Sequence, residues 1–345
     1  MNCQGYVRLI AQGKEREAAE EMRLHTPFGS ILGRVCTQPC ETTCERGKLD
    51  GAVHLRALKR YLAETYPEIA RRPGEVRLST GMNVAVVGSG PAGLMAAYDL
   101  RVTGHTVRVF EALDQSGGML RYGLPAFRLP TNEVDAALQM LEIMGVVFQT
   151  ATPVGKSIEW GVLLEDYDAV ILALGLGQSA QLGFKGEGLP DVWRGLDFLR
   201  RARGGLMPEL GDSVVVIGGG NTAVDAALTC RRVGVREVRL VCVESREAMP
   251  AFQAEIIEAI EEGVIIEAGW GPLEIEAQQG RLKVDFGSCL SLYDEEGNFN
   301  PKVSSECGMS LKTDTIILAV GQTIEASGLP LVLLEGGGRR LPVNV

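Results

Sequence analysis

The sequence lacks the features that would place the protein in a membrane, on a nucleic acid or in an oxidising compartment. No apolar run approaches the roughly 20 residues that span a bilayer, and the first residues, MNCQGYVRLIAQGKERE, lack the apolar core of a signal peptide. The net charge of −10 leaves no basic surface for nucleic-acid phosphates. The eight cysteines, three clustered and five scattered, do not form the pattern of a disulfide framework. We therefore expect a soluble cytoplasmic protein without membrane insertion and without a nucleic-acid partner.

Two similar units of strand, glycine turn, helix and strand are present instead. Residues 1–70 show apolar residues at helical spacing, and the units begin near Met82 and Asp212. Their strands are continuous apolar runs, which are typical of parallel strands covered on both faces. Looser alternation between residues 263 and 309 predicts an antiparallel hairpin or two. The pattern predicts an α/β fold with two doubly wound dinucleotide-binding domains.

The first glycine turn has the sequence GSGPAG and follows a predicted strand. Its first glycine allows a sharp bend, its second lets the backbone approach a pyrophosphate, and its third packs helix against strand. The helix that follows directs free N–H groups at the phosphates. Glu111 ends the next strand, where it can accept hydrogen bonds from an adenosine ribose, and a purely structural turn would leave it unexplained. The predicted dinucleotide-binding residues are Gly88, Gly90, Pro91, Ala92, Gly93 and Glu111.

The second glycine turn repeats this arrangement, with alanine as the third small residue. A second site suits hydride chemistry, because one nucleotide stays bound while the other arrives as substrate; the structural alternative is a duplicate that binds nothing. Cations recognise the 2′-phosphate of NADPH, but only Arg246 is available after the second strand, and Glu244 would oppose it. The sequence therefore favours NADH. The predicted binding residues are Gly218, Gly219, Gly220, Asn221, Thr222, Ala223, Glu244, Ser245 and Arg246.

Three cysteines, Cys36, Cys40 and Cys44, lie in a loop between the predicted helices. Closely spaced thiolates suit an iron–sulfur cluster. The triplet lacks the CxxC pairs of zinc ribbons and an obvious fourth local ligand. His54 is expected to be an ordinary surface or capping residue, and Cys3 a core residue of a helix.

Five segments covering nearly the whole chain carry a family resemblance: GRVCTQPCETTCERG, VAVVGSGPAGLMAAYDL, EALDQSGGMLRYGLPAFRLP, VVVIGGGNTAVDAALT and ESREAMPA. Together they resemble the small subunit of bacterial glutamate synthase, a module shared with dihydropyrimidine dehydrogenase and bifurcating ferredoxin–NADP reductases. The resemblance implies FAD at the first glycine turn, NAD(P)H at the second, and 4Fe–4S clusters at the cysteines. It implies that Gly321 and Gln322 lie near the contact between nicotinamide and flavin. The further FAD-binding residues that it implies are Ala112, Gly118, Met119, Leu120, Arg128, Val154, Ala173 and Gly175.

The sequence departs from that family where metal and nucleotide ligands are expected. Members carry four more cysteines upstream of the segment where this chain begins, and these complete the clusters. Lys59 stands where some members have a glutamine or glutamate ligand, and Val243 and Glu244 replace a pair of arginines. Members also continue past residue 345 into a flavin-binding motif. We therefore expect a fragment of a longer polypeptide, rather than a short natural variant, with an incomplete ligand set for iron.

The strand TIILAVG, which follows the second unit, looks like the strand that should return to the first and so predicts how the domains are arranged. We expect a helical iron–sulfur domain at 1–75, an FAD-binding domain at 80–195 and 311–345, and an inserted NAD(P)H-binding domain at 196–310. The strand at 315–321 should then return to the first core.

The implied function is that of an electron-input subunit of a hetero-oligomeric complex. Hydride would pass from NAD(P)H to FAD, and electrons would continue to iron–sulfur clusters and partner redox subunits. No catalytic side chain is expected, because the protein supplies positioning and electrostatics. Glutamate synthesis is the first expectation, with ferredoxin, a pyrimidine or another redox complex as alternatives. A nucleotide-binding scaffold without turnover is the alternative of a different class, which a visible absorption spectrum would separate from a flavoenzyme.

Overall fold

The computed structural model describes residues 2–324, which fall into two units. The first unit comprises residues 2–121 and 126–175, and the second comprises residues 122–125 and 176–324. No helix in these residues is long and apolar enough to cross a bilayer.

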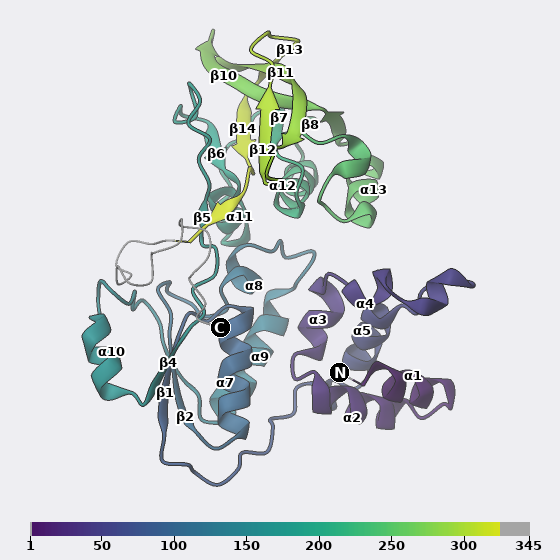
Figure 1. The fold of residues 1–345 in the computed structure, drawn as a ribbon, viewed down its shortest axis with the longest axis vertical. Coiled ribbons are helices and arrows are strands. Elements are labelled where there is room, and N and C mark those ends of the chain that lie inside the picture. Colours follow the sequence, from purple (N-terminus) through teal and green to yellow (C-terminus); the bar gives the residue numbers. More distant parts are fainter. Residues whose placement is uncertain (1, 325–345) are drawn as a thin grey trace. The chain divides into compact units, whose positions relative to one another are not determined.

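The first unit begins with a helical segment (Figure 1). One apolar cluster forms the core of this segment. Tyr6, Ala19, Met22 and Leu62 belong to this cluster, because apolar residues at helical spacing bury one face of each helix. The helices are α1 (Cys3–Ala11), α2 (Glu15–His25), α3 (Gly29–Val35), α4 (Pro39–Thr42), α5 (Leu55–Thr65) and α6 (Pro67–Ala70), with a 3-10 turn, η1, at Glu45–Lys48.

The rest of the first unit is a parallel sheet between helices. The strands are β1 (Asn83–Val87), β2 (Thr106–Phe110), β3 (Val147–Gln149) and β4 (Ala169–Leu172), in the order β3-β2-β1-β4. The helices are α7 (Pro91–Val102), α8 (Met119–Tyr122), α9 (Thr131–Ile143) and α10 (Trp160–Asp166). Figure 1 shows α7 and α9 on one face of the sheet and α10 on the other. This arrangement confirms the predicted doubly wound fold.

The second unit contains a five-stranded parallel sheet, in the order β6-β14-β7-β8-β9. Val214 and Val216 pack in the cluster of helices α11, α12 and α13, whereas Val215 and Ile217 pack against the antiparallel strands. Successive strand residues point to opposite faces, so the continuous apolar run reflects a strand buried on both sides. The elements are β5 (Gln178–Ser179), β6 (Val192–Arg194), α11 (Gly195–Arg203), β7 (Ser213–Ile217), α12 (Asn221–Arg232), β8 (Glu237–Cys242), η2 (Arg246–Ala248), α13 (Gln253–Glu261), β9 (Ile265–Ala268), β14 (Thr315–Leu318) and β15 (Gln322–Thr323).

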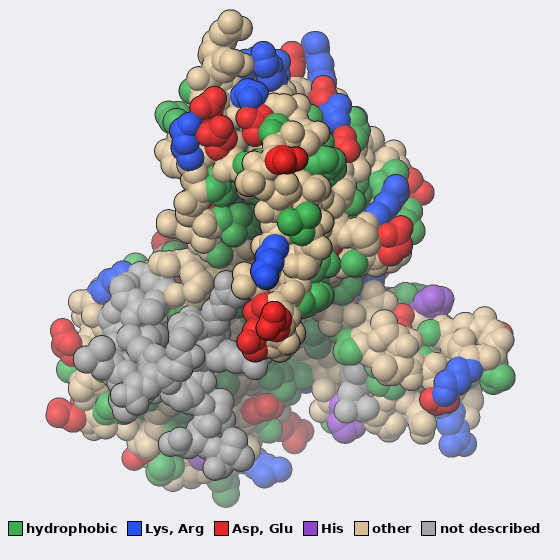
Figure 2. All heavy atoms as spheres, turned by 45° about the horizontal axis from the view of Figure 1, so that its top comes forward, with side chains coloured by type: hydrophobic (Ala, Val, Ile, Leu, Met, Phe, Trp, Pro, Cys, Tyr) green, Lys and Arg blue, Asp and Glu red, His purple; other side chains and the backbone are tan. Residues whose placement is uncertain are grey.

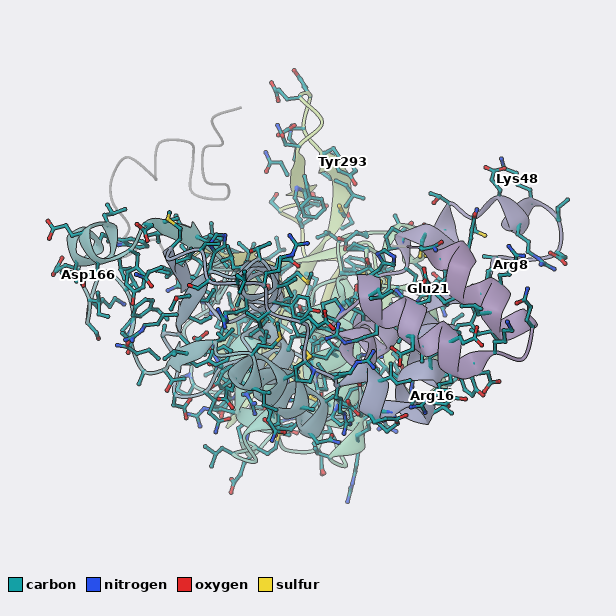
Figure 3. The ribbon with its side chains drawn as sticks, turned by 90° about the horizontal axis from the view of Figure 1, so that it is seen from below. Arg8, Arg16, Glu21, Lys48, Asp166 and Tyr293 are labelled. Atoms are coloured by element: carbon teal, nitrogen blue, oxygen red, sulfur yellow. The ribbon has the colours of Figure 1, made fainter. Side chains whose placement is uncertain are left out.

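The predicted antiparallel hairpins are present. In the chain they lie between β9 and β14 of this sheet. They comprise β10 (Trp270–Gln278), β11 (Arg281–Tyr293), β12 (Phe299–Val303) and β13 (Met309–Thr313), and β11 pairs with each of the other three. On the β11–β12 hairpin, the ring of Tyr293 packs edge-on against that of Phe299, with centroids 6.0 Å apart (Figure 3).

The expectation that the strand at 315–321 returns to the first core is wrong. Strand β14 pairs in parallel with β7 and β6 of the second sheet, and residues 176–195 also belong to the second unit. One residue, Asp314, joins β13 to β14, and its Oδ2 accepts hydrogen bonds from the backbone N of Asp212 and of Ser213, each at 2.9 Å. This contact fixes the start of β14 beside the start of β7. Residues 325–345 of the predicted FAD-binding domain lie outside the described residues.

Within the first unit, buried charges join the helical segment to α9. The Glu133 carboxylate accepts a hydrogen bond from the Ser30 hydroxyl and forms ion pairs with Arg34 at 3.3 Å and Arg71 at 3.2 Å. The Arg23 guanidinium, also buried, donates to the Tyr98 hydroxyl at 2.9 Å. These contacts fix the helical segment on the first sheet's helices.

Candidate functional site

The first glycine turn joins β1 to α7 and leaves its middle glycine open. Gly88 has a φ of 106°, and a Cβ there would overlap the carbonyl oxygen of Ala173. A Cβ on Gly93 would overlap the carbonyl oxygen of Gly88. At Gly90, by contrast, no atom of residues 2–324, apart from the glycine and its chain neighbours, lies within 4 Å of the Cβ position. The space beside Gly90 is therefore free for a ligand, as the role of the second glycine requires.

Helix α7 directs an uncapped N-terminus at this space. It runs for 12 residues from Pro91, and its N-cap residue, Gly90, provides no side-chain cap. Proline at the first helical position has no N–H to leave unpaired. The N–H groups that follow supply hydrogen-bond donors and a partial positive charge, which suit a pyrophosphate.

Glu111 lies directly after β2 and is 6% exposed. Its Oε2 accepts hydrogen bonds from the backbone N and the hydroxyl of Ser89, and its Oε1 accepts one from the backbone N of Leu113 at 2.9 Å. The Ser89 hydroxyl oxygen accepts a hydrogen bond from the backbone N of Gly117 at 2.9 Å. Ser89 thus ties the carboxylate to the turn. The glycine pattern did not predict this role, although a hydroxyl between two glycines was the available signal.

The segment around Gly118 lies against the same turn. Gly118 has a φ of 51°, and a Cβ there would lie 2.6 Å from the Cα of Gly90. The buried Ser116 hydroxyl has no hydrogen-bond partner among residues 2–324. Such a group is costly, and an oxygen atom of FAD would satisfy it. The first turn therefore fits FAD.

The structure brings six of the predicted residues together at this turn: Gly88, Gly90, Gly93, Glu111, Gly118 and Ala173. The roles toward FAD of Ala112, Met119, Leu120, Arg128, Val154 and Gly175 stay predictions.

The second glycine turn, between β7 and α12, has the same geometry. Gly218 has a φ of 141° and packs against the carbonyl oxygen of Ala319, and Ala223 is fully buried. Within the described part of the chain, no atom beyond the neighbours of Gly220 lies within 4 Å of its Cβ position, and Gly220, the N-cap residue of α12, provides no side-chain cap. The second turn therefore fits a dinucleotide as well.

The predicted Gln322 lies at this second turn. Its Nε2 donates a hydrogen bond to the hydroxyl of Thr222 at 3.1 Å, and the neighbouring Gly321 accepts one from the backbone N of Ala180 at 2.9 Å. Asn221 donates through its side chain to Glu255 at 2.6 Å. The start of α12 is thus held from two other segments of the second unit.

The three clustered cysteines are partly exposed and free. Cys36 directly follows α3, Cys40 lies in α4, and Cys44 precedes η1. Hydrogen bonds from the backbone of Val53 and Arg46 lower the pKa of the Cys44 thiol, which favours the thiolate that a metal needs. Residues 2–324 contain no group of three or more His, Cys, Asp or Glu side chains arranged to hold a metal ion. The roles of Cys36, Cys40 and Cys44 as iron–sulfur ligands stay predictions.

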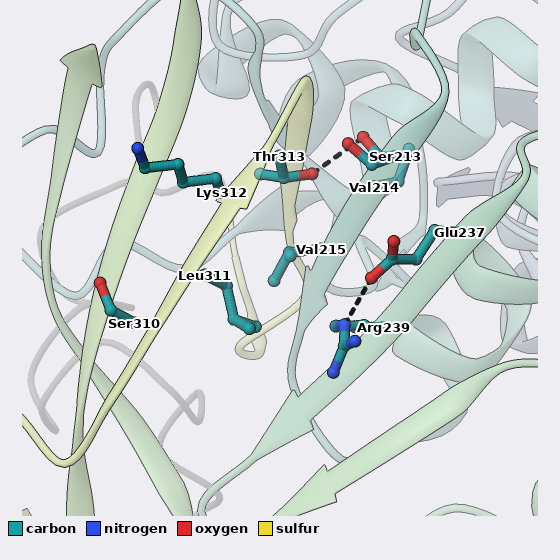
Figure 4. Close-up of a pocket in the computed structure, with 9 residues that line it drawn as sticks. All are labelled: Ser213, Val214, Val215, Glu237, Arg239, Ser310, Leu311, Lys312 and Thr313. Carbon is teal, nitrogen blue, oxygen red and sulfur yellow. Dashed lines mark hydrogen bonds and ion pairs between the residues drawn. The ribbon is translucent and has the colours of Figure 1, made fainter.

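A small pocket of about 210 Å³ lies at the amino ends of β7 and β8 (Figure 4). Its lining includes Ser213, Glu237, Arg239 and Lys312. Dinucleotides bind beyond the carboxyl ends of parallel strands, and Gly218 lies at that other end of β7. The pocket is therefore not part of the dinucleotide site.

Charged side chains of both signs are interspersed on the face shown in Figure 2, where Lys and Arg lie among Asp and Glu over the second unit. The described residues on this face form no continuous basic patch of the kind that binds a phosphate backbone.

Two family matches cover most of the chain. Residues 82–339 match the Pyridine nucleotide-disulphide oxidoreductase family, and residues 1–70 match the family described as dihydropyrimidine dehydrogenase domain II, 4Fe-4S cluster. The chain shares the fold of Mycobacterium tuberculosis FprA in complex with NADPH, with a TM-score of 0.61 and 21% identity over 72% of this chain and 73% of that one.

Curated relatives align with nearly the whole chain. The NADP(+)-dependent formate dehydrogenase subunit beta of Moorella thermoacetica is 34% identical over 95% of this chain, which spans only 50% of that protein. The glutamate synthase (NADPH) small chain of Azospirillum brasilense is 30% identical, over 95% of this chain and 71% of that one. The NAD-dependent dihydropyrimidine dehydrogenase subunit PreT of Escherichia coli O157:H7 is 31% identical, over 92% and 73%.

Both glycine turns lie inside the longer family match, and the relatives include the module whose motifs the sequence resembles. The chain therefore belongs to the pyridine nucleotide-disulphide oxidoreductase family, in the group that includes the glutamate synthase small chain.

Proposed function

We propose that this chain takes electrons from NAD(P)H through FAD and passes them to iron–sulfur centres and partner redox subunits. The observation that carries the proposal is the pair of glycine turns, each with an open middle glycine and a buried carboxylate after the next strand. One turn would hold a resident cofactor, and the other would receive a nucleotide substrate. Bound FAD would supply the chemistry, because it accepts two electrons together and releases them singly.

The chain's own residues bind and orient in this proposal, and none transfers a proton at a reacting atom. The N-termini of α7 and α12 hold the two pyrophosphates. Glu111 accepts hydrogen bonds from the ribose of FAD, in a position that Ser89 maintains. Gln322 and Thr222 lie together at the turn that receives the nucleotide substrate.

Valine at either middle glycine tests the two sites separately. Both positions have extended backbone angles that valine accepts, and no described residue beyond the chain neighbours lies within 4 Å of either Cβ position, so the chain should fold. Gly90→Val should abolish FAD retention. Gly220→Val should retain FAD but prevent its reduction by NADH or NADPH.

The measurement is the visible absorption spectrum before and after anaerobic addition of each nucleotide, with circular dichroism as the control for folding. A colourless wild-type chain, or bound flavin that neither nucleotide reduces, would support the nucleotide-binding scaffold instead.

For the acceptor, we propose the glutamate synthase complex, because this chain spans 71% of a glutamate synthase small chain and shares its motifs. The relatives named for formate and dihydropyrimidine dehydrogenases support the same module with another acceptor. Purification of the native complex separates these candidates. Glutamate formation from glutamine and 2-oxoglutarate supports the first, whereas NAD(P)-linked turnover of formate or a pyrimidine supports the second.

A further inference from the structure

A buried carboxylate oxygen lies beside the second glycine turn without a hydrogen-bond partner among residues 2–324. Glu244 follows β8 and is 7% exposed, and its Oε2 receives no hydrogen bond there. A Cβ built on Gly219 would lie 2.5 Å from this oxygen. The carboxylate therefore lies against the turn, next to the open space at Gly220.

The equivalent carboxylate of the first turn, Glu111, has hydrogen-bond donors that Glu244 lacks. Ser89 occupies the position between the first two glycines there, and its backbone N and hydroxyl both donate to Glu111. Gly219 occupies the same position in the second turn and has no side chain to donate. Since an unpaired buried acceptor costs free energy, the orphaned Glu244 oxygen indicates a donor that arrives with a ligand.

No protein cation neutralises this carboxylate within the described chain. Glu244 forms none of the ion pairs found among residues 2–324, and Arg246 is exposed on η2. Burial, reinforced by the charge of Glu244, raises the pKa of the neighbouring Cys242 thiol to about 12, so this thiol stays neutral. It donates to the backbone carbonyl oxygen of Glu244 at 3.6 Å. Glu244 thus lies beside the turn without a cationic partner among residues 2–324.

We propose that Glu244 accepts a hydrogen bond from the 2′-hydroxyl of an adenosine ribose and so selects NADH over NADPH. This inference rests on the proposed function, because it assigns the nucleotide that the second turn receives. A carboxylate at the end of the second strand faces the ribose of a dinucleotide whose pyrophosphate lies on the glycine turn. NADH brings a hydroxyl donor to the orphaned oxygen, whereas the 2′-phosphate of NADPH brings negative charge, which the buried carboxylate repels.

The assignment separates this chain from the formate dehydrogenase and glutamate synthase relatives, whose names carry NADP or NADPH. The competing possibility is that exposed Arg246 folds over a 2′-phosphate. A single exposed cation gains little in water, and Glu244 would remain unpaired.

ADP-ribose and 2′-phospho-ADP-ribose test the inference, because they differ only in the 2′-phosphate and undergo no redox chemistry. Isothermal titration of the 345-residue chain should show at least about tenfold tighter binding of ADP-ribose, the contribution of one charge-assisted hydrogen bond. Glu244→Gln keeps the shape but removes the charge and should reduce this ratio at least about tenfold. Glu247→Gln removes a charge from an exposed neighbour on η2 and should leave the ratio unchanged.

Equal or tighter binding of 2′-phospho-ADP-ribose by the wild-type chain would overturn the inference, and so would a Glu244→Gln ratio equal to that of the wild type. Binding of neither ligand would overturn it too. Reduction of the bound flavin tests the proposed function separately. If NADH or NADPH reduced the flavin while the wild type preferred 2′-phospho-ADP-ribose or Glu244→Gln kept the wild-type ratio, only the inference would fail. If neither nucleotide reduced the flavin, the proposed function would fail. The two failures are therefore distinguishable.

Discussion

The two repeats share a glycine pattern, but single residues within it differ in function. Each repeat places a carboxylate after its second strand, Glu111 in the first and Glu244 in the second. The residue between the first two glycines decides how each carboxylate is held: Ser89 donates to Glu111, whereas Gly219 offers no side chain to Glu244. Protein donors therefore hold Glu111 in position for its proposed ribose, whereas the Oε2 of Glu244 has no donor among residues 2–324.

Removing the first carboxylate should weaken FAD retention. Glu111→Ala deletes the ribose acceptor, and hydrogen bonds to charged groups contribute about 1.5–3 kcal/mol each. The flavin-to-protein ratio after extensive dialysis should fall, while thermal unfolding reports how far the turn itself is disturbed. The matched control is Ser89→Ala, which keeps the acceptor but removes the donor that orients it, and its loss of flavin should be smaller. Unchanged flavin content in Glu111→Ala would count against this role.

At the scale of elements, an aspartate directly precedes the last strand, in chain order, of each of the two parallel sheets. Asp168 precedes β4, and its Oδ2 accepts a hydrogen bond from the backbone N of Asn83 at 2.7 Å. Asp314 precedes β14 and accepts from the backbone N of Ser213 in the same way. The carboxylate joins the start of β4 to the start of β1 in the first unit, and the start of β14 to the start of β7 in the second. These contacts explain why each repeat closes its own sheet.

Asp314→Ala should lower the free energy of unfolding of the second unit by about 1–3 kcal/mol, because backbone donors and the Arg281 guanidinium lose a charged partner. Urea unfolding followed by tryptophan fluorescence measures this, since Trp193 and Trp270 lie in the second unit. Glu296→Ala, at an exposed turn, is the control and should change little. Equal stability of Asp314→Ala and wild type would contradict the prediction.

The stability difference between wild type and Asp314→Ala should also depend on pH. Burial raises the pKa of Asp314, but hydrogen bonds from Ser213 and Arg281 outweigh it and lower the pKa overall. A carboxyl with a lowered folded pKa stabilises the fold above its unfolded pKa, and this stabilisation disappears as the pH falls through the folded value. The difference between wild type and Asp314→Ala should therefore be constant near neutral pH and shrink below about pH 4. A difference that grew on acidification would refute this.

At the scale of the whole molecule, buried charges fix the helical segment within the first unit. Glu133, 8% exposed, pairs with Arg34 and Arg71 from the helical segment and the stretch after it. Removing one member of a buried ion pair leaves its partner uncompensated, at a cost of about 3–5 kcal/mol.

Glu133→Ala should therefore lower the unfolding free energy by about 3 kcal/mol, the lower end of that range because Arg34 keeps its pair with Glu64. Limited proteolysis should cut the stretch at 71–82 faster, as the helical segment separates from α9. Glu64→Ala removes the more exposed partner of Arg34 and should change neither result appreciably. Equal cleavage rates for Glu133→Ala and wild type would argue against this role of the charges.

The three clustered cysteines lead to a prediction about the iron and sulfide content of the chain. A 4Fe–4S centre usually takes four protein ligands, and Cys36, Cys40 and Cys44 are only three. The isolated 345-residue chain should therefore contain much less than one cluster per molecule by iron and sulfide analysis, and the serine variants of the three cysteines should reduce it further. A stable stoichiometric cluster that is lost in these variants would show that the three residues suffice with a ligand of another type.

The sequence by itself determined the two repeats and their chemistry, because these depend on local patterns. A glycine turn between an apolar run and a helix specifies its own backbone, and a carboxylate after the next strand follows from the unit's length. The open space at Gly90 and Gly220 is what the spacing of the glycines predicted. The family resemblance added FAD, NAD(P)H and the iron–sulfur domain, which the family matches confirm.

Only the tertiary structure decided which strand closes which sheet and which polar groups remain unpaired. The strands at 169–172 and 315–318 are both short, apolar and followed by small residues, so the sequence alone assigned the second to the wrong core. Its position depends on Asp314 reaching Ser213, 101 positions away. The orphaned Glu244 oxygen likewise depends on burial by segments that are not adjacent in sequence. Local patterns set the turns, whereas pairing and desolvation arise only when distant segments pack together.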